Sequence, residues 1–247
     1  MVYLQFLFLV LTSLLYHGSV QAQYSHSKLI ISGANAAPKL IPNQVFVDQR
    51  LSDSIDSLKI YFGAVDITNI YETGQQRLIV KRKNIIVHSE YDPHKLLNDI
   101  ALIRLPAEIL FDEYIQPAKL PDPDKLYDNE IGVVSGWGIF DRNSWSTPNN
   151  LQWFNVTIFP YEECKRLVHK YEGFHASFYP TSNICLKPSQ GLTCNGDSGG
   201  PLAIRNEDGT TTIVGLTSFG LEDTCEPNMP DIFTRVSSFL QWIKENE

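Results

Sequence analysis

The chain has 247 residues, of which 43% are hydrophobic and 19% are charged, and its formal net charge at pH 7 is −8. This composition is ordinary for a folded protein and excludes a fibrous repeat or a disordered chain. The acidic balance argues against a nucleic-acid partner, which would require a basic face. The length permits one large all-β domain or two small ones around a sizeable core.

An apolar run covers residues 6–15, near the N-terminus, and is followed by Val20, Gln21 and Ala22. Such a run near the N-terminus, followed by small residues, is typical of a secretory leader and is too short to span a membrane. No lysine or arginine precedes the run, and a buried core helix is the alternative. We predict a signal peptide at residues 1–22, cleavage after Ala22, and a secreted, extracellular product without a membrane anchor.

Short apolar or alternating runs recur between turn residues along the rest of the chain. The runs cover residues 43–47, 57–65, 77–88, 101–105, 131–140, 151–159, 211–220 and 231–236. This spacing is typical of an all-β sandwich or barrel. Residues 201–216 predict a hairpin whose turn contains Asp208 and Gly209, because that dipeptide readily adopts positive φ.

The C-terminal tail has a different periodicity from the β runs. Val236, Leu240 and Ile243 recur at helical spacing, and Ser237 is a residue type that caps helix starts. We therefore predict a terminal amphipathic helix over about residues 236–247, packed on a β core and capped by Ser237. From the residues alone, the fold class is all-β with a C-terminal helix.

Four cysteines lie in the second half of the chain, at Cys164, Cys185, Cys194 and Cys225. In a secreted protein an even count predicts disulfides, here two, with three possible pairings. No Cys-x-x-Cys spacing suggests zinc, so no metal site and no cofactor are expected. Asn155 begins an Asn-Val-Thr triplet, which is an acceptor site for N-glycosylation in the secretory path.

The segment GDSGGP, residues 196–201, carries the strongest chemical signal. Its glycines permit a tight turn whose N–H groups point at one spot. The N–H groups of Gly196 and Ser198 could therefore hold an anion that forms beside the Ser198 hydroxyl. A plain glycine-rich turn is the alternative, but further segments agree with the catalytic interpretation in order and spacing.

Taken together, these segments resemble the trypsin/chymotrypsin family of serine endopeptidases, from about Ile30 to the C-terminus. The matching segments are IISGANAAP at 30–38, NDIALIRL at 98–105, VSGWG at 134–138, GDSGGP at 196–201 and TSFG at 217–220. The resemblance implies two six-stranded antiparallel barrels with the active site between them. It places the first barrel at about 30–120, the second at about 121–235, and a short propeptide at 23–29.

The resemblance also assigns roles to individual residues. Ser198 would be the nucleophile and Asp99 the aspartate of a catalytic triad, with the oxyanion held by the N–H groups of Gly196 and Ser198. Asp197 would pair with the new amine of Ile30 after activation. The substrate pocket would involve Leu192, Thr193, Ser218, Phe219, Gly220 and Asp231.

The same resemblance implies the disulfides, the activation step and the specificity. The cysteines would pair as Cys164–Cys185 and Cys194–Cys225. Activating proteases in the family cut after a basic residue, whereas here Leu29 separates Lys28 from Ile30. Leu192 at the pocket floor argues against strict trypsin-like specificity. A carboxylate at Asp231 on the opposite wall would suit large apolar and some basic side chains, unless it faces solvent.

The general base of the family is absent from its expected place. Family members carry an Ala-Ala-His-Cys segment before the aspartate segment, but residues 43–68 contain neither histidine nor cysteine. Deletion of one block explains this pattern, and it would leave the first barrel incomplete with exposed strand edges. The six histidines are His17, His26, His88, His94, His169 and His175. Of these, His94 is the main substitute candidate and His88 the next.

Three interpretations remain open at this point. The first is a serine endopeptidase by lineage whose sequence lacks one block. The second is a non-catalytic homologue with a binding or regulatory role, and the third is a β-domain unrelated to proteolysis. The motifs favour the first interpretation for the lineage, and we expect little catalysis by a chain with this sequence. The expected partners are protein or peptide substrates and an activating protease, with no nucleic acid and no membrane, and the expected state is a monomer.

Overall fold

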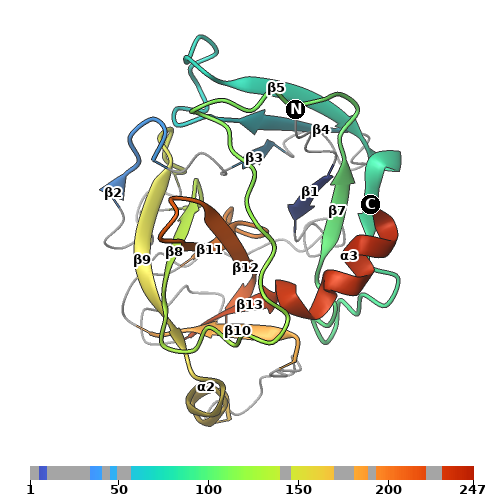
Figure 1. Ribbon diagram of the computed structural model, residues 1–247, viewed down its shortest axis with the longest axis vertical. Coiled ribbons are helices and arrows are strands. Elements are labelled where there is room, and N and C mark those ends of the chain that lie inside the picture. Colours follow the sequence, from blue (N-terminus) through green and yellow to red (C-terminus); the bar gives the residue numbers. More distant parts are fainter. Residues whose placement is uncertain are drawn as a thin grey trace.

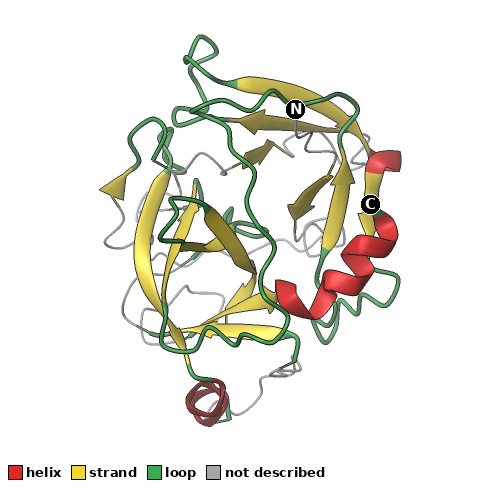
Figure 2. Ribbon diagram, viewed as in Figure 1, coloured by secondary structure: helices red, strands yellow, loops and turns green. Residues whose placement is uncertain are grey.

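The computed structural model describes residues 6–9, 34–40, 45–48, 57–139, 146–169, 181–188, 193–220 and 230–247 (Figure 1). Strands dominate this part of the chain, and the helices lie at the periphery (Figure 2). None of the helices in these ranges is long and apolar enough to cross a membrane. The predominance of strands and the helix at the C-terminal end confirm the all-β class with a C-terminal helix.

The second half of the chain forms a closed six-stranded antiparallel barrel. Hydrogen bonding runs in the order β8, β9, β10, β13, β12 and β11, and β11 pairs back with β8. The strands are β8 (Ile131–Gly136), β9 (Gln152–Phe159), β10 (Asn183–Leu186), β11 (Pro201–Arg205), β12 (Thr211–Gly220) and β13 (Asp231–Arg235). A short strand, β2 (Ala34–Asn35), adds to β9 outside the ring. Closure removes free edges from this barrel.

Alternation along the strands explains the barrel core. In β9 the side chains of Phe154, Val156 and Ile158 are buried, whereas Asn155 between them is exposed. Strand residues alternate between faces, so one apolar set fills the interior. The predicted hairpin is confirmed between β11 and β12, and Gly209 adopts a φ of 79° at its turn.

The first half of the chain forms two three-stranded sheets around one core. One sheet has the order β3 (Val45–Asp48), β4 (Ser57–Phe62) and β5 (Gln76–Lys81). The other has the order β1 (Phe6–Leu9), β7 (Ala101–Arg104) and β6 (Ile85–Val87). Within the described ranges no strand pairing joins the two sheets, and this half is not a closed ring.

The run at 77–88, expected as one strand, is divided in the structure. A 3-10 helix, η1 (Arg82–Asn84), separates β5 from β6 and passes the chain from one sheet to the other. Leu58, Ile60 and Val80 from one sheet pack with Ala101 and Ile103 from the other. The core is therefore continuous even though the hydrogen bonding is not.

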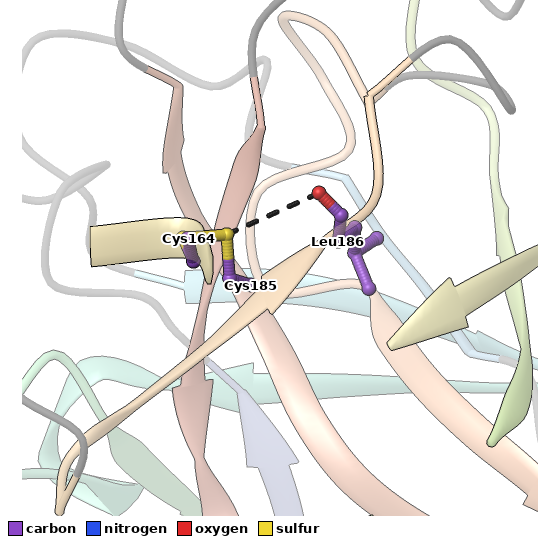
Figure 3. The surroundings of a disulfide bond; sticks show 3 residues. All are labelled: Cys164, Cys185 and Leu186. Carbon is purple, nitrogen blue, oxygen red and sulfur yellow. Dashed lines mark hydrogen bonds between the residues drawn. A yellow bond between two sulfur atoms is a disulfide. The ribbon is translucent and has the colours of Figure 1, made fainter. Parts of the chain in front are cut away.

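One helix was not expected from the sequence. Helix α2 (Tyr161–Val168) follows β9 and buries Cys164 and Val168. A disulfide joins Cys164 to Cys185 in β10, which fixes the helix to the barrel (Figure 3). The predicted Cys164–Cys185 pairing is thus present. Cys194 is also disulfide-bonded, and its predicted partner Cys225 lies outside the described residues.

The C-terminal helix is present but begins differently from the prediction. Residues Val236–Phe239 form a 3-10 turn, η2, and α3 spans Leu240–Asn246. The prediction that Ser237 caps the helix is wrong, because Ser237 lies inside η2 and neither start has a side-chain cap. Val236 and Ile243 are buried, as the helical spacing predicted. The domain boundaries stay predictions.

Candidate active site

A tight backbone turn carries Ser198. The N–H of Asp197 donates to the carbonyl of Cys194 (2.9 Å), and the N–H of Gly200 donates to the carbonyl of Asp197 (2.8 Å). The turn is fixed to β12, because the N–H of Gly199 donates to the carbonyl of Thr217 (2.9 Å) and the N–H of Thr217 donates to the carbonyl of Gly200 (2.9 Å). Ser198 is half-buried at this turn.

Two glycines bring a second segment against the turn. Gly196 adopts a φ of 102°, and a Cβ there would lie 3.1 Å from the Cα of Gly138. A Cβ on Gly138 would in turn overlap the carboxyl group of Asp197. Only glycine satisfies both the positive φ and the close approach at Gly196. The resemblance assigns oxyanion binding to Gly196 and Ser198, and that role stays a prediction.

The carboxyl group of Asp197 is buried beneath the turn. It accepts hydrogen bonds from the N–H of Gly138 (2.8 Å) and the N–H of Cys194 (3.0 Å). Burial raises the pKa of Asp197 to about 6, and the two N–H donors oppose that rise. Ile30, its predicted partner after activation, lies outside the described residues. The predicted pairing of Asp197 with the Ile30 amine therefore stays untested.

Asp99 lies two residues before the start of β7 and is only 1% exposed. Its carboxylate accepts a hydrogen bond from the hydroxyl of Ser218 (2.6 Å), and its carbonyl accepts one from the hydroxyl of Thr234 (2.8 Å). Burial raises the pKa of Asp99 to about 7, and the Ser218 hydroxyl opposes the rise. Both hydroxyls belong to or flank strands of the closed barrel, so the barrel positions the aspartate.

A β-bulge explains how Ser218 reaches Asp99. In the β12–β13 ladder, Thr217 pairs with Phe233 and Phe219 pairs with Ile232, which leaves Ser218 as the extra residue. Bulges redirect a side chain and often occur beside active sites. Thr217 therefore holds the Ser198 turn while the next residue, Ser218, holds Asp99. Consecutive residues of β12 thus bring the predicted nucleophile and the predicted aspartate into one region.

The sequence placed Ser218 only in the substrate pocket and missed its contact with Asp99. The two residues lie 119 positions apart, and nothing local to either segment pairs them. Phe219 is half-buried and Gly220 is exposed at the end of β12, where the resemblance places substrate backbone. Leu192, the predicted pocket floor, lies outside the described residues.

Asp231 is buried rather than facing solvent. Its carboxylate accepts hydrogen bonds from the N–H of Thr193 (2.7 Å) and from the Thr193 hydroxyl (3.0 Å). Burial raises the pKa of Asp231 to about 7, while the Thr193 donors lower it and the charge of Asp197 adds to the rise. These contacts join the segment before Ser198 to β13, where the sequence predicted two walls of a pocket.

His88 and His94, the two candidates for a substitute base, have other surroundings in the structure. His88 packs against Phe239 and Trp242, with ring centroids 5.5 Å and 5.0 Å apart, and burial lowers its pKa. His94 is exposed in a turn where its N–H donates to the Asp92 carboxylate (2.9 Å). Among the residues with described side chains, no group of three metal-ligating side chains could hold a metal ion.

Comparison with known proteins agrees with this geometry. The family model described as "Trypsin" matches residues 42–243. Brachyurin from Leptuca pugilator is 34% identical over 233 residues, covering 87% of this chain and 97% of that protein. Chymotrypsin-2 from Vespa crabro is 34% identical over 175 residues, covering 70% and 73% of the two chains.

A third relative bears a name that includes the word "Inactive". "Inactive CLIP domain-containing serine protease A8" from Anopheles gambiae is 29% identical over 226 residues, which cover 91% of this chain but 61% of that protein. The chain therefore spans less than two thirds of that relative. The family match, the closed barrel and the shared anchoring of Ser198 and Asp99 lead to one conclusion: this chain belongs to the trypsin family.

Proposed function

We propose that this chain is a secreted trypsin-family protein that binds peptide segments but does not hydrolyse them at a useful rate. One observation carries the proposal. Strand β3 pairs directly with β4, the connection covers residues 49–56, and no histidine occurs anywhere from residue 27 to residue 87. We infer that the segment that carries the general base in the family is missing before Asp99.

The loss of a base has a large effect on a serine nucleophile. A serine hydroxyl attacks a carbonyl only when a neighbouring base accepts its proton. In a comparable triad, loss of the histidine lowers turnover by about 10⁶-fold, and roughly 10³–10⁴-fold acceleration over water survives from the oxyanion site and binding. Asp99 does not replace the base, because its role is to orient an imidazole and its carboxylate is already bonded to Ser218.

Peptide binding needs fewer parts than hydrolysis, and two features of the described residues support it. The end of β12 at Phe219 and Gly220 is partly exposed, and an extended peptide can add to such a strand. Asp231, held by Thr193, would set the polarity of the adjoining pocket. We infer a preference for large apolar and some basic side chains. Peptide-library binding with a strict Arg/Lys preference would contradict that specificity.

Secretion and activation belong to the same proposal. The apolar run before Ala22 and the disulfide between Cys164 and Cys185 support passage through an oxidising compartment. An activating protease would release Ile30 only by cutting after Leu29, so it would need an apolar preference. Secreted protein that still begins at Met1 would contradict the leader, and processed protein that begins at Leu29 would contradict the Ile30–Asp197 pairing.

The decisive experiment compares the unmodified chain with Ser198→Ala. We expect equal, background hydrolysis of peptide esters by both proteins and no labelling of either by an organophosphonate, while both bind the same peptides. Insertion of an Ala-Ala-His-Cys-containing family segment after Val47 should restore hydrolysis and labelling together. Hydrolysis by the unmodified chain that disappears in Ser198→Ala would refute the proposal, and His94→Ala and His88→Ala would then identify the base.

A further inference from the structure

Strand β7 occupies an unusual place in the first half of the molecule. It lies between β6 and β1, so each of its two edges is paired (Figure 1). On the β6 side the partner is Ile85–Val87, close in sequence. On the other side the partner is Phe6–Leu9, more than 90 positions earlier in the chain. The second partner therefore needs an explanation.

Both faces of β7 are buried, in two different cores. Ala101 and Ile103 pack with residues of β4 and β5, and Leu102 packs with Leu216 of β12 and with Phe239 beside α3. The side chains of Ala101, Leu102 and Ile103 are each 0% exposed. Strands buried on both faces lie inside sheets rather than at edges, because an edge leaves N–H and C=O groups without partners. The edge of β7 opposite β6 thus requires a strand.

The burial of β7 also defines which strand fits that edge. In an antiparallel pair, residues opposite each other lie on the same face of the sheet. A residue opposite Ala101 or Ile103 is therefore on the face of one apolar core, and a residue opposite Leu102 is on the face of the other. A fitting strand must be apolar at successive positions, whereas an ordinary half-exposed strand alternates apolar and polar residues.

The sequence of β1 meets that requirement. Its residues are Phe-Leu-Phe-Leu, and the register places Leu7 opposite Ile103, Phe8 opposite Leu102 and Leu9 opposite Ala101. The predicted cleavage after Ala22 would remove β1 and leave the β7 edge unpaired. The same short apolar run can thus act as a leader and fit the edge of the incomplete barrel.

We propose that the β7 edge is a strand-acceptor site whose specific occupant is the apolar N-terminal segment of this chain, Phe6–Leu9. In the uncleaved chain the segment binds in cis as a strand of the first half. In a chain cleaved after Ala22 the site is vacant and accepts the same sequence in trans. The proposal does not depend on whether the chain hydrolyses peptides.

Amide hydrogen exchange on the chains 1–247 and 23–247 tests this proposal. Neighbouring strand residues direct their N–H groups to opposite edges, so one of the Leu102 and Ile103 amides faces β1 and the other faces β6. We expect the β1-facing amide to exchange faster in 23–247, on the order of 100-fold, while the β6-facing amide changes less. Protection of Val214 in β12 reports that the closed barrel is folded.

Peptide addition tests the occupant directly. A peptide of residues 4–11, LQFLFLVL, carrying terminal lysines for solubility, should restore protection in 23–247 with saturation at one peptide per chain. The same peptide with N-methylated amides should not restore it, because it lacks the donors that form the ladder. Full-length 1–247 should not bind the peptide, because its own segment fills the site.

Proline variants of the full chain give an independent arm that does not require 23–247 to fold. Only one of Leu7 and Phe8 directs its N–H toward β7, so only one of Leu7→Pro and Phe8→Pro removes a ladder donor. That variant should speed the exchange of the β1-facing amide of β7, whereas Thr12→Pro, outside β1, should not.

Equal β7 exchange in 1–247 and 23–247, or failure of the peptide to protect the shortened chain, would overturn the proposal. Concentration-dependent protection of 23–247 alone would overturn the choice of occupant in favour of a second copy. If 23–247 folds only when refolded with the peptide, the acceptor role is supported, and failure to fold with the peptide counts against it.

Discussion

Replacement of Asp99 by asparagine should stabilise this protein. The Asp99 side chain is buried, with Asp99 only 1% exposed, and its carboxylate accepts a hydrogen bond from the Ser218 hydroxyl at 2.6 Å. An asparagine carbonyl oxygen has nearly the same shape and can accept that hydrogen bond. The substitution therefore removes a buried charge while it keeps the packing and the contact with Ser218.

The size of the effect follows from the pKa of Asp99, which burial raises from 3.8 to about 7. Because the folded-state pKa lies above the unfolded value, the folded state binds the proton more tightly. The stability that protonation contributes is fully present below about pH 4 and is lost as the pH rises through about 7. At about 1.4 kcal/mol per pKa unit, the raised pKa lowers the stability of the folded state, relative to low pH, by about 4 kcal/mol at pH 8, where Asp99 is ionised in both states. At pH 5 the loss is about 2 kcal/mol, because the folded state keeps the proton that the unfolded chain has released.

Urea unfolding at pH 5 and pH 8 measures this difference. We expect Asp99→Asn to exceed the unmodified chain in unfolding free energy at both pH values, with the gap widening by roughly 2–3 kcal/mol at pH 8. Asp124→Asn, at an exposed carboxylate, is the matched control, and its unfolding free energy should equal that of the unmodified chain at both pH values. If Asp99→Asn is less stable than the unmodified chain at pH 8, the carboxylate is stabilised there by a cationic partner, and the reasoning fails.

Three further predictions concern the second barrel. Replacing Cys164 and Cys185 together by serine should lower the unfolding free energy by about 3 kcal/mol, because their disulfide closes a loop with a sequence separation of 21; an unchanged urea midpoint in the double variant would contradict this. Gly138→Ala should displace the carboxyl group of Asp197 and destabilise the barrel, as checked by thermal unfolding, because the new Cβ overlaps that group. Asn155 is exposed on β9, so secreted protein should lose mass on treatment with a peptide N-glycosidase, and Asn155→Gln should abolish that loss.

Local patterns were sufficient to predict most strands and the turn at Ser198. Alternating burial in β9 follows directly from its sequence, since Phe154 and Val156 are apolar and Asn155 is polar. The Asp208–Gly209 turn was equally clear, because positive φ at Gly209 carries a cost for other residues. The positive φ of Gly196 has the same origin. In each case the cause lies within a few residues of the effect.

Features that depend on distant contacts were not predictable from the sequence. Helix α2 is short and depends on the Cys164–Cys185 disulfide and on packing against the barrel, so its eight residues gave no signal. The Ser218–Asp99 hydrogen bond depends on a bulge that exists only when β12 meets β13. Ser237 had the right residue type for a cap, but the chain entered a 3-10 turn first.

The double burial of β7 has a consequence for how the molecule unfolds. Ile103 belongs to the core of the first half, while its neighbour Leu102 belongs to the core that also contains Leu216 of the closed barrel. A strand shared in this way cannot leave one core without opening the other. The two halves should therefore melt as one cooperative unit, although within the described residues only one of them forms a closed ring. Calorimetry should show a single transition whose van't Hoff enthalpy equals the calorimetric enthalpy of unfolding. Fluctuations that loosen β7 should disturb the packing of both halves at once.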